Sequence, residues 1–223
     1  AKAKADLIII SGAEGGTGAR PASSIRYAGL PSEIGLAETQ QTLVLNNLRG
    51  QVRLQVDGQL KTGRDVILQA MLGAEEFGFA TSALIVLGCV LMRKCHMNTC
   101  PVGVATQNED LRKRFMGKAD YLVNFFTFLA QEIREYLAEI GVKTFDEIVG
   151  RNDLLTIKEG VKVSKTNHLD FSKLLYHPAE CSTNAIINVT QQEHDIKNVL
   201  DRELINRSFP SITSGMPVEL DFT

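Results

Sequence analysis

Short apolar runs that each precede a turn are the feature that most constrains how this chain can fold. Leu7-Ile8-Ile9-Ile10 is a continuous apolar run that leads into a glycine-rich turn. Such a run is typical of a strand that is covered on both faces in a parallel sheet. Residues 51–56 alternate between polar and apolar side chains, and residues 76–80 form a third short run, so we expect two further strands there.

Helical patterns follow each of these expected strands. Residues 35–48 place leucines and a valine at approximate helical spacing, and residues 66–72 predict a second helix that Thr62 or Asp65 can cap. A third helix is expected from Thr81. Strand and helix therefore alternate, which is the βα repeat of an α/β protein.

The beginning of the chain and the number of repeats both predict a part of something longer. The chain opens at Ala1 without a starting Met or a signal peptide and runs almost directly into the first strand. Three βα units are also too few to close a barrel. We therefore expect the missing strands to come from an upstream segment or from another chain.

The second half of the sequence has a different pattern. Residues 110–140 have apolar side chains at three- and four-residue spacing, which predicts one long amphipathic helix that Gly141 ends. A capping-box pattern at Thr144–Glu147 predicts a further short helix. Near the end of the chain we expect a helix around residues 193–200 and a terminal strand at residues 217–222.

Charge and composition exclude several classes of protein. The net charge of −2 offers no polycationic surface for nucleic acid, and no apolar run approaches the ~20 residues that cross a bilayer. Four cysteines in 223 residues do not form the pattern of a secreted disulfide scaffold. Because three of them cluster as thiols, we expect an intracellular, reducing compartment.

The cysteine cluster is the strongest chemical signal. Cys89, Cys95 and Cys100 lie within twelve residues, and Pro101 follows the last of them. Zinc sites usually show paired CxxC spacings, which are absent, whereas a Pro after the last Cys recurs in ferredoxin-type iron–sulfur runs. Three ligands fit a three-iron cluster, or a four-iron cluster that Cys181 completes. The alternative is three buried, unreactive thiols.

Two glycine turns in consecutive βα units predict a phosphate or flavin site. Loops after the last strands of (β/α)₈ barrels commonly bind phosphate through their backbone N–H groups. Glycine has no side chain, so an anion can come close to these groups. Ordinary βα turns are the alternative, since every βα protein has them. The candidate cofactor-binding residues are Asp57, Gly58, Gln59, Gly78, Phe79 and Thr81.

A third glycine-rich loop follows the first strand. The carboxyl end of a strand is where barrel enzymes place their chemistry, so this loop is a candidate for the substrate and flavin face. It does not have the GxGxxG pattern of a dinucleotide-binding fold. A long turn onto a helix is the alternative. The candidate residues are Ser11, Gly12, Glu14, Gly15, Gly16, Thr17 and Gly18.

Taken together, these segments resemble the synthase domain of glutamate synthase large subunits. The blocks occur in that family's order and spacing from residue 1 to about residue 155. They are Ser11-Gly12-x-x-Gly15-Gly16-Thr17-Gly18-Ala19, Gly29-Leu30-Pro31, Gly35-Leu36-Ala37-Glu38-Thr39-x-Gln41-Thr42-Leu43, Val56-Asp57-Gly58-x-Leu60-x-Thr62-Gly63-Arg64-Asp65-Val66, Gly73-Ala74-Glu75-Glu76-Phe77-Gly78-Phe79, and Cys95-His96-x-Asn98-Thr99-Cys100-Pro101-Val102-Gly103-Val104-Ala105-Thr106-Gln107.

The resemblance implies a fold in three parts. Residues 1–109 would be the last three βα units of an FMN-binding (β/α)₈ TIM-like barrel, together with an iron–sulfur loop. Residues 110–181 would be a helical extension and connector, and residues 182–223 the start of a β-rich, β-helix-like domain.

The resemblance also implies the cofactor sites. The three clustered cysteines, Cys89, Cys95 and Cys100, would hold a 3Fe-4S cluster, and Cys181 would have no cluster role. Gly58 and Gly78 would lie near the FMN phosphate.

The same resemblance implies an oxidoreductase of glutamate biosynthesis and ammonia assimilation. In that family a donor reduces the cluster and FMN, ammonia from a glutaminase domain adds to 2-oxoglutarate, and the resulting 2-iminoglutarate is reduced to L-glutamate. The flavin and cluster carry the redox chemistry while the protein orients them. The upstream glutaminase domain and early barrel strands are implied partners, without which we expect no activity. The donor would be an NADPH-oxidising small subunit or ferredoxin, and the compartment the cytoplasm or the plastid stroma.

Four positions depart from the family's usual pattern. Ala13-Glu14 stands where the family usually has His-Asp, Gln59 where it has a second Gly, and Arg20 where it has Ser. These changes bear on the substrate contacts. Two alternatives therefore stay open: an iron–sulfur module for electron transfer or cluster assembly, and a related flavin enzyme that acts on another 2-oxo acid.

Overall fold

The structure is a computed structural model that describes residues 3–13, 15, 21–158 and 168–221. The chain divides into two compact units, Ala1–Thr190 and Gln191–Thr223. The sites predicted above all belong to the first unit, so the fold of that unit determines how they are positioned.

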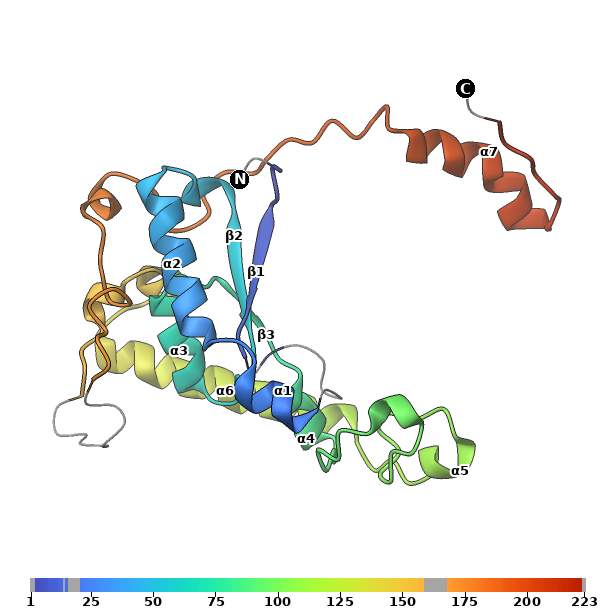
Figure 1. The fold of residues 1–223 in the computed structure, drawn as a ribbon, viewed down its shortest axis with the longest axis horizontal. Helices are drawn as coiled ribbons and strands as arrows, with labels where there is room; N and C mark the ends of the chain where they lie inside the picture. The colour runs from blue at the N-terminus through green and yellow to red at the C-terminus, as the bar shows by residue number, and fades with distance from the viewer. Residues whose placement is uncertain (1–2, 14, 16–20, 159–167, 222–223) are drawn as a thin grey trace. The chain divides into compact units, whose positions relative to one another are not determined.

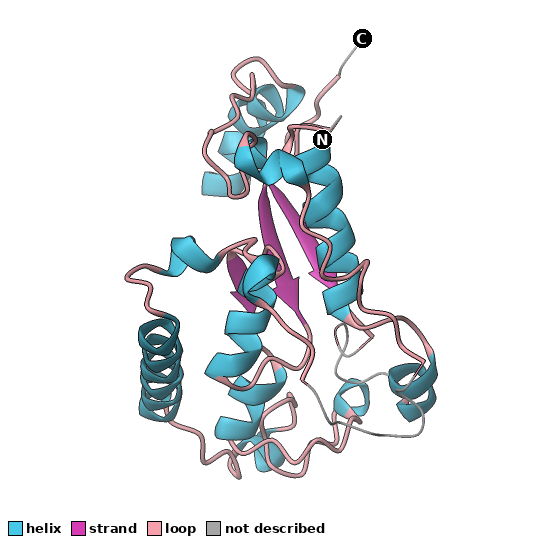
Figure 2. Cartoon of the chain, turned by 90° about the vertical axis from the view of Figure 1, so that its left-hand side faces the viewer, coloured by secondary structure: helices cyan, strands magenta, loops and turns pink. Residues whose placement is uncertain are grey.

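Three parallel strands form the centre of the first unit. They are β1 (Leu7–Ser11), β2 (Arg53–Asp57) and β3 (Glu76–Gly78), and they pair in the order β1-β2-β3. All three arrows point the same way in Figure 2. The predicted α/β class with parallel strands is thereby confirmed; its extension to an eight-stranded barrel stays a prediction.

Helices connect consecutive strands. After β1 come α1 (Ala22–Tyr27) and α2 (Ser32–Leu45), after β2 comes α3 (Gly63–Met71), and after β3 comes α4 (Thr81–Val86). A short 3₁₀ helix, Arg49–Gln51, leads into β2. Figure 1 shows α2 and α3 on the same side of the strands.

The start of α3 is fixed by its sequence. Both predicted caps act together: the Thr62 hydroxyl accepts a hydrogen bond from the Asp65 N–H, and the Asp65 carboxylate accepts one from the Thr62 N–H. This capping box satisfies two N–H groups that would otherwise lack partners, which stabilises the helix start by about 1 kcal/mol. The helix therefore begins at Gly63, three residues before the predicted start.

The hydrophobic core lies on the helix-covered side of the sheet. Leu54 and Val56 of β2 are completely buried against Leu36 of α2, and each such side chain contributes about 1.5–3 kcal/mol. On β1, by contrast, Ile9 is 55% exposed. The expectation that β1 is covered on both faces is therefore wrong within the described residues, because only one face of the strand is covered there.

A buried ion pair holds the amino ends of the strands. Arg49 is fully buried, and its Nη2 lies 2.7 Å from Glu75 Oε2. Its guanidinium also donates to the carbonyls of Val52 and Gly73. Glu75 in turn accepts from the Asn188 N–H, which ties a distant segment to the sheet. Burial lowers the pKa of Arg49, and the attraction of Glu75 only partly offsets that effect.

The predicted long helix over 110–140 is found as two helices. They are α5 (Glu109–Arg112) and α6 (Ala119–Ile140), and the chain turns between them at residues 113–118. Gly117 lies in this break, and Gly103 packs against it: a Cβ atom on Gly103 would stand 2.5 Å from Leu111 O and 3.0 Å from Phe115 N. Gly141 ends α6 in a left-handed conformation, as predicted.

Beyond α6 the chain is mostly irregular. The predicted capping box at Thr144 and Glu147 is present and begins a 3₁₀ helix, Phe145–Ile148. Two further 3₁₀ helices, Asn152–Leu154 and Ala179–Ser182, complete the described part of this unit.

The second unit differs from the prediction. Its helix is α7 (Leu200–Ser214), whereas residues 191–199 are irregular, so the expected helix around 193–200 is wrong. The described part of the expected terminal strand, 217–221, is also irregular. A strand needs a neighbour for its backbone N–H and C=O groups, and within the described residues none pairs with this segment. The predicted domain division at 110 and 182 stays a prediction.

Among the described residues, none of the helices is long and apolar enough to pass through a membrane.

Candidate functional site

Two neighbouring regions contain the predicted site residues. The first, which we call the sheet edge, comprises the carboxyl ends of β1, β2 and β3 and the loops that follow them. The register pairs Ser11 with Asp57 and Asp57 with Gly78, so the three strand ends form one row. Residues far apart in sequence are brought together here, as the βα pattern predicts.

Asp57 lies between two glycines at the centre of this row. A Cβ atom on Gly15 would stand 2.8 Å from Asp57 Oδ1, and one on Gly78 would stand 2.9 Å from Asp57 Cβ. These positions therefore have room only for glycine. Asp57 Oδ1 is buried and has no hydrogen-bond partner among the described residues. Such an acceptor is costly to leave unsatisfied, and a ligand with a hydroxyl or N–H group would satisfy it.

The loops after β2 and β3 are joined by two hydrogen bonds. Gln59 Nε2 donates to Thr81 Oγ1 over 3.4 Å, and Ser82 Oγ donates to the carbonyl of Leu60 over 2.9 Å. The backbone of Gly58 and Gln59 is left-handed at both residues, with φ of 115° and 57°. The candidate residues of these two loops thus form one continuous surface.

Phe79 contributes differently from the other candidates. Its ring packs against the core and meets Phe126 of α6 edge to face, with centroids 5.3 Å apart. The side chain is therefore part of the packing, and a ligand contact from this residue would come from its backbone.

The described part of the loop after β1 folds onto the start of α2. A Cβ atom on Gly12 would stand 2.4 Å from Ser32 N, and the Ala13 N–H donates to the carbonyl of Leu30. Gly15 N–H donates to Gly12 O, which closes a tight turn beside Asp57. The other candidates of this loop lie outside the described residues; they are Glu14, Gly16, Thr17 and Gly18, together with the departure at Arg20.

The second region is the cysteine loop, residues 89–107. Helix α4, about 9 Å long, connects it directly to the sheet edge. Cys89, Cys95 and Cys100 line one apolar hollow of about 40 Å³. Cys181 lines a different hollow, with Asn152 and Pro178. The structure thus gathers the three predicted ligands and separates the fourth cysteine from them.

Asn98 holds the cysteine loop closed. Its Oδ1 accepts hydrogen bonds from the Gln107 N–H and the Thr106 hydroxyl, each over 2.7 Å. Its backbone is left-handed, with φ of 57°, and Leu91 and Arg93 are left-handed as well. Non-glycine residues in this conformation cluster at functional sites. Asn98 is thus a supporting residue that was not among the predicted site residues, although an Asn between two cysteines is a signal for a left-handed turn.

Backbone N–H groups surround the sulfur of Cys100. Burial raises the pKa of this thiol, but hydrogen bonds from the backbone of the four residues at 102–105 together outweigh it, so the pKa lies below its ordinary value. At Cys89, the Leu91 N–H donates to the sulfur over 3.4 Å. Donors of this kind stabilise thiolates and tune iron–sulfur clusters.

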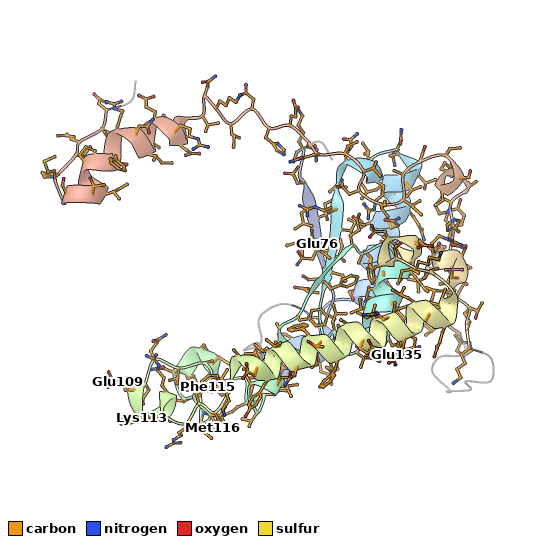
Figure 3. The ribbon with its side chains drawn as sticks, turned by 180° about the vertical axis from the view of Figure 1, so that it is seen from behind. Glu76, Glu109, Lys113, Phe115, Met116 and Glu135 are labelled. Atoms are coloured by element: carbon orange, nitrogen blue, oxygen red, sulfur yellow. The ribbon has the colours of Figure 1, made fainter. Side chains whose placement is uncertain are left out.

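The turn after α5 lies next to this loop. Phe115 and Met116 occupy it, between α5 and the first turn of α6 (Figure 3), and they are 41% and 80% exposed. Lys113 and Asp110 of the same segment form an exposed ion pair. The cysteine loop is therefore bordered by exposed apolar side chains.

Cys89, Cys95 and Cys100 are the donor type that would hold an iron–sulfur cluster. Within the described ranges, no three His, Cys, Asp or Glu side chains converge closely enough to hold one ion. A cluster requires less convergence, because its thiolates bond to different iron atoms.

The fold and the site define an α/β protein with two linked features. Its parallel sheet ends in a glycine-rich edge, and one short helix, α4, joins that edge to a loop with three cysteines. The family model described as a conserved region in glutamate synthase matches residues 1–143. The chain therefore belongs to the glutamate synthase family.

Individual relatives agree with this assignment. The glutamate synthase [NADPH] large chain of Bacillus subtilis is 57% identical over 202 residues, which are 90% of this chain and 13% of that protein. The glutamate synthase [NADH] of Schizosaccharomyces pombe is 50% identical over 218 residues, 97% of this chain and 10% of that protein. The ferredoxin-dependent glutamate synthase of Antithamnion sp. is 51% identical over 209 residues, which are 93% of this chain and 14% of that protein. The chain thus spans only 10–14% of the length of these relatives.

Proposed function

We propose that this chain is the flavin and iron–sulfur portion of a glutamate synthase, the last three βα units of its (β/α)₈ barrel. The observation that carries the proposal is that the predicted cysteines and the predicted glycine turns lie in two adjacent regions. Three cysteines line one hollow, and one short helix joins that hollow to a glycine-rich sheet edge, where Asp57 Oδ1 has no hydrogen-bond partner within the described part of the chain. When bound, FMN supplies the hydride for reduction and a 3Fe-4S cluster supplies electrons to it.

At the sheet edge, the chain's own residues bind and orient the flavin. Asp57 accepts a hydrogen bond from a ligand hydroxyl at its Oδ1, which has no partner among the residues that the structure describes. Gly15 and Gly78 leave the space beside it open, because any side chain there would collide with Asp57. Gly58, Gln59 and Thr81 supply donors for the phosphate, and Phe79 fixes the loop through its packing on α6.

In the cysteine loop, Cys89, Cys95 and Cys100 ligate the cluster. The backbone N–H groups around Cys100 favour the thiolate that an iron atom requires. The separate location of Cys181 supports three protein ligands rather than four.

The substrates and partners are proposals on the same basis. We infer that ammonia and 2-oxoglutarate form 2-iminoglutarate at the face of the Ser11–Gly18 loop, where its reduction gives L-glutamate. The upstream remainder of the enzyme supplies the ammonia and the other barrel strands. Electrons come from an NADPH-oxidising subunit or from ferredoxin. The cytoplasm or the plastid stroma would keep the three thiols reduced.

The test is to join the chain to the segment that precedes this region in its relatives and to assay the extended protein anaerobically. We expect glutamate formation that requires ammonia, 2-oxoglutarate and a reductant. Other 2-oxo acids serve as competing substrates, and the Asp57→Ala variant serves as the control with a damaged sheet edge. Turnover of a different 2-oxo acid in preference to 2-oxoglutarate would contradict the proposal.

A second candidate function is an iron–sulfur module that only transfers electrons or assembles clusters. The observation that favours it is the local character of the cysteine loop, since all three cysteines lie within residues 89–100 and their hollow is lined only by residues 89–105 and Leu84 of α4. Visible absorption of the anaerobically purified extended protein separates the two functions. Cluster bands with flavin bands support the synthase, whereas cluster bands alone support the module.

A further inference from the structure

A hollow with acidic walls lies between the starts of α2 and α3. It measures about 280 Å³, which is room for an ion together with several waters. Glu33 of α2 lines it, and so do Asp65 and Gln69 of α3. Asp57 and Thr81 do not line it, so the hollow is distinct from the part of the sheet edge to which the flavin is assigned.

Gln69 is the most informative side chain of this hollow. It is only 3% exposed, and its Nε2 donates to Ser32 Oγ over 3.1 Å. Because Ser32 lines the hollow as well, the Gln69 amide lies in its inner wall. The Oε1 of that amide is buried and has no hydrogen-bond partner among the described residues. Leaving a buried acceptor unsatisfied is costly, and a ligand that binds the oxygen would remove this cost.

Two carboxylates face the same hollow. Asp65 uses Oδ2 for the N–H groups of Lys61 and Thr62, which leaves Oδ1 for a ligand. Glu33 is half-buried, and no ion pair between described residues neutralises it. Both acids stand in the first turn of a helix, where the helix dipole favours them. That effect accounts for the two acids but not for the buried oxygen of Gln69, which lies near the other end of α3.

Oxygen donors of this kind suit a hard divalent cation. Mg²⁺, Mn²⁺ and Ca²⁺ bind carboxylate, amide and water oxygens. Mg²⁺ in particular keeps several of its waters and is held by one or two carboxylates. The hollow matches this preference, since it offers two carboxylates, one amide oxygen and space for water. No cysteine or histidine lines it, which disfavours zinc.

We propose that this hollow is a site for a hydrated divalent cation of the magnesium type, held by Glu33, Asp65 and Gln69. The cation links the starts of α2 and α3. Gly58 and Gln59 also line the hollow, so the cation stabilises the loop after β2 from the helix side. The inference does not rest on the proposed function, because neither flavin nor cluster takes part.

Mn²⁺ binding to the extended protein tests the site. Mn²⁺ takes the same oxygen ligands as Mg²⁺, and its room-temperature electron paramagnetic resonance signal weakens when it binds. We expect one site that Mg²⁺ displaces, with a Kd of about 0.1–1 mM, the range of weak oxygen sites. Glu33→Gln should raise this Kd about tenfold or more. Glu38→Gln is the matched control: Glu38 lies on the same helix but lines a different hollow, so the Kd should stay within about twofold.

Variants of Gln69 separate a ligand from a merely structural amide. Gln69→Glu adds a third carboxylate, so its Tm without metal should fall, whereas its Mn²⁺ Kd should fall about tenfold because affinity follows ligand charge. Gln69→Met removes the oxygen at similar size and should weaken Mn²⁺ binding about tenfold. A structural role alone would lower the Tm of both variants and leave the affinity unchanged. Gln69→Glu decides the question even where Gln69→Met does not fold, since Mn²⁺ should restore its Tm.

The outcomes decide between a cation site and a hollow that holds water only. Binding that Mg²⁺ displaces, that Glu33→Gln weakens and that Gln69→Glu tightens supports the proposal. No Mn²⁺ binding below about 10 mM overturns it. Equal losses in Glu33→Gln and Glu38→Gln also overturn it, because they would reflect diffuse negative charge. Failure of the protein to bind flavin or a cluster would count against the proposed function alone.

Discussion

The sheet edge and the cysteine loop lie at opposite ends of α4, yet they are held in different ways. At the sheet edge, parallel backbone pairing fixes Ser11, Asp57 and Gly78 in one row above a buried apolar core. The cysteine loop has no strand and little core. It is held by the hydrogen bonds of Asn98 and contains left-handed residues that carry full side chains.

This difference indicates which cofactor site exists before its ligand arrives. The sheet edge is preformed, because its geometry comes from the core and would persist without a flavin. The cysteine loop instead surrounds its hollow with irregular backbone that side-chain hydrogen bonds hold in place. We therefore expect the cluster to stabilise its own loop, as structural metals do, whereas flavin binding changes the sheet edge little.

The largest effect should come from the cysteines themselves. Changing Cys89, Cys95 or Cys100 to Ser removes a cluster ligand, so the visible cluster absorption of the reconstituted protein should be lost. Cys181→Ser is the matched control and should retain it, because Cys181 lines another hollow. Loss of cluster absorption in the Cys181 variant would contradict the assignment of Cys89, Cys95 and Cys100 as the only cysteine ligands.

Removing the buried ion pair at the amino ends of the strands should destabilise the sheet that carries the sheet edge. Arg49→Ala leaves Glu75 without its cation, and breaking a buried pair in this way costs about 3–5 kcal/mol of unfolding free energy. Arg53→Ala is the control, because the Arg53–Glu76 pair is exposed and contributes about 0–1 kcal/mol. Urea unfolding measures both. Similar losses of unfolding free energy in the two variants would contradict the claim that buried interactions support the sheet and its edge.

A smaller change tests the fit around Asp57. In Gly78→Ala the new methyl group would stand 2.9 Å from Asp57 Cβ, which should destabilise the protein by about 1–3 kcal/mol. Gly35→Ala in α2 meets only Ile10 at 3.4 Å and should stabilise the protein by about 0.5–1 kcal/mol. Thermal unfolding of both variants checks the difference in sign. A neutral Gly78 variant would mean that the edge is not preformed.

The smallest effect concerns thiol reactivity in the protein without its cluster. The thiolate is the reactive form, so alkylation of each cysteine rises with pH around that cysteine's own pKa. The pKa of Cys100 is lowered by backbone N–H groups, whereas burial and then the charge of Asp153 raise the pKa of Cys181. Alkylation of Cys100 should therefore begin at lower pH. Mass spectrometry of iodoacetamide-labelled peptides measures both profiles, and coincident profiles would contradict the difference between the two sites.

Much of the fold could be predicted because its determinants are local. The strands follow from short apolar runs, the start of α3 from Thr62 and Asp65, and the end of α6 from Gly141. The apolar spacing continues across the break before α6 and so does not indicate it, although Gly117 within the break is a helix-breaking signal. The helix of the second unit was expected around residues 193–200, but α7 begins at Leu200. No side chain caps α7 at Val199, so the sequence has no capping signal for the start of this helix.

The candidate site shows the same division. The cysteines and the glycine turns are identified by residue type and spacing, so their positions could be predicted. The unsatisfied Oδ1 of Asp57 and the bond from Gln59 to Thr81 depend on strand register, which one sequence does not specify. Asn98 supports the cysteine loop through contacts eight and nine residues away, which no local pattern predicts.

The most direct test of the central claim is iron analysis and electron paramagnetic resonance of the anaerobically reconstituted chain. Our account predicts about three iron atoms per chain and the paramagnetic signal of an oxidised three-iron cluster, both unchanged in Cys181→Ser. A single bound metal ion, a four-iron cluster that requires Cys181, or the absence of bound iron would contradict it.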